Sequence, residues 1–267
     1  MGTYIYRTKK TRHENYHQLI WMLAKTDFQL RYQNSFLGYI WAILKPLILF
    51  TVLNFVFSSI FNPRNIGGEY YSLGLLVGLL IFFFFSEGTN AGMTSLLNKG
   101  DLVTKIFVPR WCIILSSTLH SAMVFFTNFV VIAFFFAWYW FLPSFTAILL
   151  CLTFTVMMYL LILSISLVLA PLFVKFRDIA MIWEVALTTI FYASPVIYPL
   201  QILPEWIQRT LLINPVAFII HFTKESMFNN HYTELWKFGL FSLSTLLFFF
   251  ACILAYKLLI PKIAESM

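Results

Sequence analysis

The stretch RYQNSFLGYIWAILKP, residues 31–46, separates a polar, basic N-terminal segment from a chain that is otherwise almost entirely apolar. A helix lying along a membrane surface must turn here to enter the bilayer. Gly38 suits such a turn because glycine has no Cβ to restrict its backbone. Tyr39 and Trp41 carry amphipathic rings that settle at headgroup level, and Lys45 can extend its ammonium back toward the interface. The stretch therefore predicts either an ordinary first membrane helix with an aromatic belt or a specialised substrate entrance.

The composition excludes both an ordinary soluble domain and a disordered chain. Of 267 residues, 60% are hydrophobic and only 11% are charged. The net charge of +7 is concentrated in a few short loops, which indicates membrane topology rather than a nucleic-acid surface. The three cysteines lie in apolar runs, so we expect no disulfide and no metal site. These features predict an all-α integral membrane protein with no nucleic-acid partner.

Six apolar runs are long enough to span a bilayer, which needs about 20 apolar residues in a helix. A basic tail (1–13) and a helix with one apolar face (14–34) precede them, and that periodicity is typical of a helix in the membrane surface or packed on a partner. A short amphipathic loop (98–110) and a proline-punctuated region (198–234) interrupt them, and the latter predicts two short helices in a re-entrant or interfacial hairpin at the outer surface. The expected spans are 39–61, 70–97, 111–141, 145–174, 179–197 and 235–256.

The basic residues predict the orientation of these spans. Most of the 18 Lys and Arg residues fall on one side of the six predicted spans, together with both ends of the chain. By the positive-inside rule that side is cytoplasmic. An even number of spans agrees with two cytoplasmic termini.

The motifs of common catalytic sites are missing from the sequence. It has no G-x-x-x-x-G-K-[ST], H-E-x-x-H, C-x-x-C or G-x-S-x-G, so we expect no ATP hydrolysis by this chain itself. Glu87 and Glu184 fall within apolar runs, and an ionisable residue at membrane depth suggests a functional site. The alternative is that both carboxylates lie near the cytoplasmic interface and pair with Arg177, Lys99 or Lys105.

Aromatic residues are the larger signal, with 31 Phe, 13 Tyr and 8 Trp. Most of these rings must face lipid or pack between helices. A pathway lined by them would also suit sugars, whose apolar faces stack on rings. Basic groups at its inner mouth would suit a phosphate.

Three segments, in this order along nearly the whole chain, resemble the permease subunit of ABC-2 type exporters. The likeness is to the branch that exports lipid-linked polysaccharide, namely O-antigen, teichoic acid and capsule. The segments are RYQNSFLGYIWAILKP, the loop KGDLVTKIFVPR followed by a span, and FRDI…SPVIYP…LPEWIQ…NP.

The resemblance implies a homodimer of six-span subunits in a bacterial inner membrane, working with two copies of a separate cytoplasmic ATPase. That partner would bind ATP and Mg²⁺, and this chain would hold no cofactor and no metal. The helix 14–34 would be an interface helix. The segment 98–110 would be a coupling helix seated on the ATPase. Its coupling residues would be Lys99, Asp101, Leu102, Lys105, Ile106, Phe107, Pro109 and Arg110.

The resemblance also implies where the substrate passes. The diphosphate of a polyprenyl-linked glycan would enter near Arg31 and the Leu37-Gly38 turn. The first and fifth spans of both subunits would line the channel, and the half-helices after Tyr198 would form an extracellular gate. The remaining substrate-binding candidates are Tyr39, Trp41, Phe50, Glu184, Phe191, Tyr192 and Tyr198.

Two other functions remain open from the sequence. A membrane-embedded glycosyl- or acyltransferase would need a convergent acid–base site, which the sequence does not offer. An ABC-2 permease that exports drugs or small lipids would share most of the same pattern.

Overall fold

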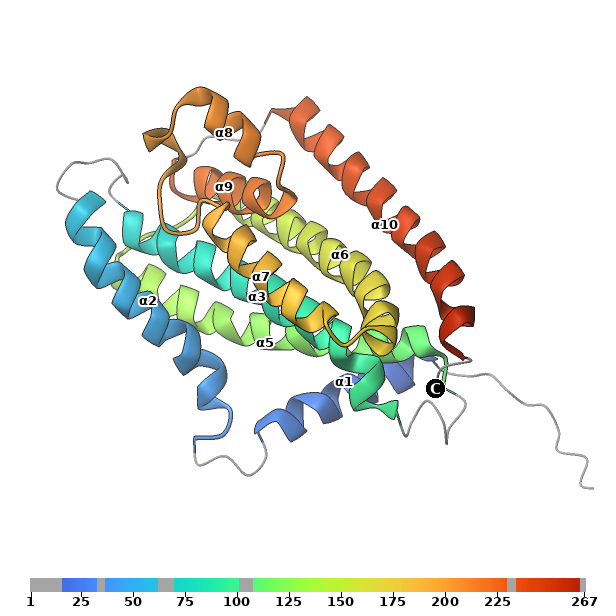
Figure 1. Cartoon of the computed structure of the whole chain (residues 1–267). Helices are drawn as coiled ribbons and strands as arrows, with labels where there is room; N and C mark the ends of the chain where they lie inside the picture. Colours follow the sequence, from blue (N-terminus) through green and yellow to red (C-terminus); the bar gives the residue numbers. More distant parts are fainter. Residues whose placement is uncertain (1–15, 33–36, 62–69, 101–107, 230–233, 265–267) are drawn as a thin grey trace, which may run out of the picture.

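The computed structural model describes residues 16–32, 37–61, 70–100, 108–229 and 234–264 (Figure 1). Over these ranges the chain is helical apart from short turns, and it contains no strand. The all-α prediction is therefore confirmed for this part of the chain. The helices are α1 (Tyr16–Tyr32), α2 (Ile40–Phe61), α3 (Tyr71–Asn98), α5 (Arg110–Trp138), α6 (Phe145–Lys175), α7 (Ile179–Tyr192), α8 (Glu205–Leu211), α9 (Pro215–Phe228) and α10 (Leu235–Ala264).

Helix α3 is the centre of the bundle, with α5, α6, α2, α7 and α9 arranged around it (Figure 1). Of its most apolar stretch, 78% is buried, against 17% for the corresponding stretches of α2 and α10. Two glycines let α6 approach it closely, as small residues do between membrane helices. A Cβ at Gly88 would lie 2.7 Å from the Ile162 side chain, and one at Gly92 would lie 2.1 Å from the Ser166 hydroxyl.

Five of the described helices are long and apolar enough to cross a membrane: α2, α3, α5, α6 and α10. The fifth predicted span, 179–197, is helical only as far as Tyr192, and α7 has just 14 residues. The chain leaves the helix there because a turn follows, in which the Val196 amide donates back to the Ser194 carbonyl. Six spans were predicted, and α7 is too short to be counted with the five.

Helix α7 and the turn after it nevertheless run antiparallel to α3 along most of its length. The Trp183 indole donates to the Thr89 hydroxyl at 3.2 Å. Further along, the Phe191 ring meets the Phe82 ring edge-on at 4.9 Å. Beyond the helix, the Tyr71 hydroxyl donates to the Ile197 carbonyl at 2.6 Å. The segment 179–197 therefore reaches from the second half of α3 to its first residue.

The proline-punctuated region forms the short helices α8 and α9, as its pattern predicts. Asn214 caps α9 by accepting from the Val216 amide at 3.0 Å, and Pro215 is the first helical residue. α9 packs against both α3 and α6, and its inner face is buried. Lys224 on that face donates to the carbonyls of Pro195 and Val196, at 2.7 and 2.8 Å. α9 is therefore part of the bundle and holds the turn after α7.

The starts of α1 and α5 and the end of α10 lie at one end of the bundle (Figure 1). The rings of Tyr16 and Trp111 are 5.7 Å apart, and Arg110 donates to the Ile260 carbonyl at 3.3 Å. α10 ends eight residues beyond its predicted end at 256, and α5 ends three residues before its predicted end at 141. The start of α1 and the end of α10 therefore lie at the same end of the bundle.

Candidate functional site

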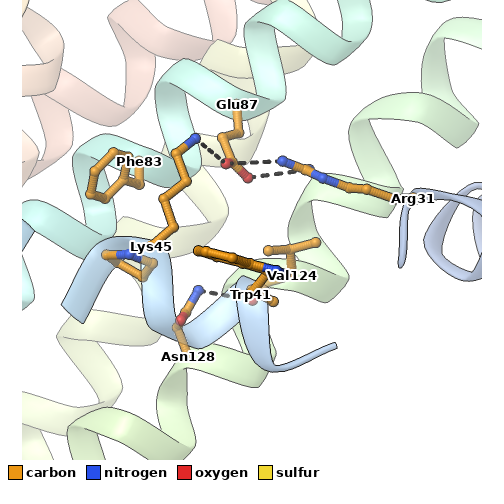
Figure 2. A pocket seen from close by; sticks show the side chains of 9 residues that line it. Arg31, Trp41, Lys45, Phe83, Glu87, Val124 and Asn128 are labelled. Atoms are coloured by element: carbon orange, nitrogen blue, oxygen red, sulfur yellow. Dashed lines mark hydrogen bonds and ion pairs between the residues drawn. The ribbon is translucent and has the colours of Figure 1, made fainter. Parts of the chain in front are cut away.

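Three charged side chains from three helices meet near α1, and we call them the charged cluster (Figure 2). Arg31 lies in the last turn of α1, Lys45 in the second turn of α2, and Glu87 in the second half of α3. The Arg31 guanidinium donates to both carboxylate oxygens, from Nη2 to Oε1 at 3.1 Å and from Nη1 to Oε2 at 3.3 Å. The Lys45 ammonium donates to Oε1 at 3.2 Å from the opposite side. One carboxylate therefore holds a cation of α1 and a cation of α2.

The two cations of the charged cluster are open to a ligand, whereas the anion is recessed. The side chains of Arg31 and Lys45 are 37% and 60% exposed, and that of Glu87 is 19% exposed. Two positive groups and one negative group leave a net charge of +1. The Lys45 ammonium also lies 5.8 Å from the centre of the Phe83 ring, within the range of a cation–π contact. The cluster therefore presents positive charge to its surroundings.

A pocket of about 290 Å³ lies directly beside the charged cluster. Its walls come from α1, α2, α3 and α5, and Figure 2 shows the Trp41 ring lying across it, near Asn128 and Val124. Flexible cations, a flat ring and an amide side chain surround one small volume. This arrangement can take an anionic group next to an apolar or sugar-like one. The lining residues are Arg31, Trp41, Ala42, Lys45, Pro46, Phe83, Glu87, Val124 and Asn128.

The turn into α2 has the conformation that its glycine allows. Gly38 has φ 49°, a left-handed backbone that other residues adopt only with strain. The Ile40 amide donates to the Leu37 carbonyl at 3.0 Å, which begins the helix. Tyr39 is 51% exposed and stacks on Phe28 of α1 at 5.2 Å. This ring pair fixes α1 against the start of α2.

His120 of α5 lies beneath the charged cluster. It is buried, its Nε2 is 3.5 Å from the Arg31 guanidinium, and its ring is 5.9 Å from that of Phe28. A guanidinium only donates hydrogen bonds, so this contact requires Nε2 as the acceptor. These contacts suit a hydrogen-bonded packing residue.

A second ion pair joins α1 to α3, one turn before Arg31. The Lys99 ammonium, at the end of α3, lies 2.5 Å from an Asp27 carboxylate oxygen. It also donates to the hydroxyls of Ser116 and Ser117 on α5, each at 3.3 Å. The side chains of Lys99 and Asp27 are only 12% and 21% exposed. Lys99 thus ties the start of the predicted coupling segment (98–110) to α1.

The predicted channel residues of α7 and its turn lie mainly on an exposed face. Glu184 is exposed and makes no ion pair within the described residues, so the proposed pairing with Arg177 or Lys99 is not seen. Tyr192, two turns further on, is 67% exposed. Phe191 is half-buried against Phe82. The Tyr198 hydroxyl donates to the Tyr192 carbonyl at 3.0 Å, so these two rings are held at the same end of α7.

Phe50 has a different environment from the other predicted channel rings. It is only 4% exposed and meets the Phe135 ring of α5 edge-on at 5.3 Å. Its burial within one subunit favours the packing alternative at this position. The structure does not bring Phe50 together with the exposed rings of α7.

The predicted coupling segment is only partly described. Asp101, Leu102, Lys105, Ile106 and Phe107 lie outside the described residues, and their role stays a prediction. The flanking residues are described. Lys99 and Arg110 make the contacts given above, and Pro109 precedes the first residue of α5.

The sequence pointed to Glu87 but not to its partners. Its expected partners were Arg177, Lys99 or Lys105, because all three fall at the predicted cytoplasmic interface. The observed partners are 56 and 42 residues away along the chain and on other helices. The only available signal was that a carboxylate in an apolar run needs a cation within reach, and two cations occur in the stretch 31–46.

No group of three or more His, Cys, Asp or Glu side chains suited to a metal occurs in the part of the chain that the structure describes. Cys112, Cys151 and Cys252 are each buried and unbridged. Charged side chains, the rings of Trp41 and Phe83 and the Asn128 amide supply the polar and aromatic groups of the pocket.

Comparison with known proteins gives a consistent result. Residues 18–228 match the family model of the ABC-2 type transporter. The chain is 25% identical over 220 residues to an O-antigen export system permease protein, RfbA, of Klebsiella pneumoniae, covering 79% of this chain and 80% of the relative. It is 28% identical over 210 residues to an RfbA permease of Myxococcus xanthus, covering 76% and 77%. It is also 22% identical over 235 residues to the polysialic acid transport protein KpsM of Escherichia coli, covering 86% and 89%. With most of its length matched, this chain belongs to the ABC-2 type transporter family.

Proposed function

We propose that this chain is the permease subunit of an ABC exporter that moves a polyprenyl-diphosphate-linked polysaccharide across the bacterial inner membrane. Relatives named for O-antigen export and polysialic acid transport support this substrate class. A partner ATPase supplies the energy by binding ATP and Mg²⁺, and this chain is not itself an enzyme. The substrate could be O-antigen, teichoic acid or capsule.

The observation that carries the proposal is the pair of cations beside an aromatic-walled pocket. Arg31 already holds a carboxylate with two N–H donors, the paired geometry that also fits a phosphate. Lys45 adds a second cation on the other side of the same anion. A diphosphate has two anionic groups for these two cations, and the Trp41 ring beside them suits a prenyl or sugar neighbour.

The assembly follows from the same reasoning. We propose a homodimer with two ATPase subunits, α1 lying at the inner membrane surface, and the segment 179–197 completing a sixth crossing. The antiparallel course of that segment along α3 supports the sixth crossing. The homodimer rests on the family resemblance, because exposed apolar residues such as Phe55 and Val185 suit lipid as well as a second subunit. Both termini would then be cytoplasmic, and α8 and α9 would form the outer gate.

The test compares Arg31→Lys with the wild type in a complex with its ATPase. A lysine keeps the charge but loses the paired donors, so we expect polysaccharide export and its stimulation of ATP hydrolysis to fall at least about tenfold, the factor for the loss of roughly one charged hydrogen bond. Lipids retained by the purified complex are identified by mass spectrometry. Normal export by Arg31→Lys would contradict paired binding. A retained drug-like molecule or phospholipid in place of a lipid diphosphate would favour the small-lipid exporter.

A further inference from the structure

Glu87 occupies the position that the proposed function assigns to the substrate. Its two oxygens accept every hydrogen bond that Arg31 and Lys45 make within the charged cluster. We propose that Glu87 is a built-in competitor anion, which keeps singly charged phospholipids out of the site and yields only to a lipid diphosphate. This inference rests on the proposed function, which puts the cluster at the inner leaflet.

The need for such a competitor follows from the surroundings of the two cations. Arg31 and Lys45 are exposed enough to meet lipid head groups, at 37% and 60%. Each Lys or Arg near an anionic leaflet raises the affinity for the lipids of that leaflet by about fivefold. Phospholipids are far more abundant than any export substrate, so two unneutralised cations would be filled by them. The Glu87 carboxylate reduces the net charge of the cluster from +2 to +1.

Geometry gives the competitor its selectivity. A phospholipid phosphodiester has one negative charge, the same as the Glu87 carboxylate that it would displace from the two cations. The exchange therefore gains no charge and leaves the recessed carboxylate without its partners. A diphosphate diester has two charges and two separate phosphates. One phosphate can bind Arg31 and the other Lys45, since these two cations lie on opposite sides of the anion that they now share (Figure 2). Only the second exchange gives each of the two cations an anionic group of its own.

Glu87→Gln tests this inference because glutamine has the same shape without the charge. The permease–ATPase complex is placed in nanodiscs of phosphatidylcholine, with or without phosphatidylglycerol, and ATP hydrolysis is followed as a polyprenyl-diphosphate-linked oligosaccharide, which is a diphosphate diester, is added. In neutral discs we expect the half-stimulating diphosphate concentration of Glu87→Gln to fall by about fivefold or more. Phosphatidylglycerol should raise this half-stimulating concentration again in Glu87→Gln and leave that of the wild type nearly unchanged.

Asp178→Asn is the matched control, since it removes an exposed carboxylate just before α7 that is not part of the charged cluster. It should show the lipid response of the wild type. Native mass spectrometry should also find more phosphatidylglycerol retained by Glu87→Gln than by either of these proteins.

The outcomes separate this inference from the proposed function. If diphosphate stimulates the wild type but Glu87→Gln shows the same lipid response, Glu87 is only a structural counter-ion and the inference is wrong. If diphosphate fails to stimulate the wild type, the proposed function itself falls. If Glu87→Gln does not fold, Glu87→Ala replaces it, because alanine also removes the competing carboxylate. Wild-type lipid response in a folded Glu87→Ala complex would then count against the inference.

Discussion

Alanine substitutions at Phe50 and Tyr192 remove rings of similar size from very different surroundings. The Phe50 ring is 4% exposed and lies against Phe135, whereas the Tyr192 side chain is 67% exposed at the end of α7. We therefore expect Phe50→Ala to destabilise the subunit. We expect Tyr192→Ala to leave the fold intact and to slow export if this ring contacts the moving glycan.

The size of the difference can be worked out from packing. Lipid is as apolar as a phenyl ring, so in a membrane the loss comes from packing rather than from transfer out of water. At about 24 cal/mol per Å³, a void of roughly 100 Å³ at Phe50 costs about 2 kcal/mol. Losing the edge-to-face pair with Phe135 adds about 0.5–1.5 kcal/mol, giving roughly 3 kcal/mol in all. Removing an exposed ring leaves no void, so the change at Tyr192 should stay within about 0.5 kcal/mol.

Thermal unfolding of the purified complex, followed by fluorescence-detected size exclusion, measures both effects. Phe50→Ala should lower the Tm and the yield, while Tyr192→Ala should match the wild type in both. Cysteine at 192 should react with a water-soluble maleimide during turnover, and cysteine at 50 should not. The three native cysteines are buried, so they should contribute little background labelling by the maleimide. A wild-type Tm for Phe50→Ala together with labelling at position 50 would refute the reasoning and return Phe50 to the pathway.

Three further changes test other parts of the structure. Asp27→Asn should weaken its charge-assisted hydrogen bond with Lys99, worth about 1.5–3 kcal/mol, and so reduce the stimulation of ATP hydrolysis by substrate. Asp178→Asn, at an exposed aspartate, is the control. Equal stimulation in the two variants would show that the Asp27–Lys99 pair has no part in coupling. Gly92→Val should push α6 away from α3, which costs about 1–3 kcal/mol or more of stability and lowers the Tm. Gly74→Ala should be tolerated, because its Cβ would meet only ordinary contacts at 3.8 Å. A stable Gly92→Val protein would contradict the close approach of the two helices. Phe107→Asp, in the predicted coupling segment, should abolish export and leave ATP hydrolysis insensitive to substrate while the protein still inserts; wild-type export from this variant would reject the assignment of the coupling segment.

The limits of most helices could be predicted because they depend on local sequence. Runs such as 40–61 and 145–175 end where Asn, Pro, Gly or charged residues make a continued membrane helix unfavourable. α7 ended early because Ser194-Pro195 begins a turn while the apolar run continues to Ile197. An apolar run does not distinguish a helix residue from a turn residue that is buried by its neighbours.

The position of each helix in the bundle could not be read from the sequence. In a soluble protein the apolar face of a helix identifies the side that packs, but a membrane helix is apolar on the side that faces lipid as well. α3 and α10 have similar hydropathy, yet 78% of one apolar stretch is buried and only 17% of the other. Gly88 and Gly92 mark the packed face of α3 in retrospect, because only small residues let α6 come so close.

The charged cluster shows why a site can be half-predicted. Arg31 was identified from the stretch in which it lies, and Glu87 from its unusual place in an apolar run. Their contact depends on how α1 packs on α5 beside α3, which no local pattern determines. The same packing brings Asp27 to Lys99, and Asp27 and Arg31 are four residues apart on one face of α1. A movement of α1 that separates Arg31 from Glu87 must therefore also stress the pair at Lys99. Because Lys99 is the second residue of the predicted coupling segment (98–110), exchange of the anion held by Arg31 and movement at the end of α3 are mechanically connected through a single helix.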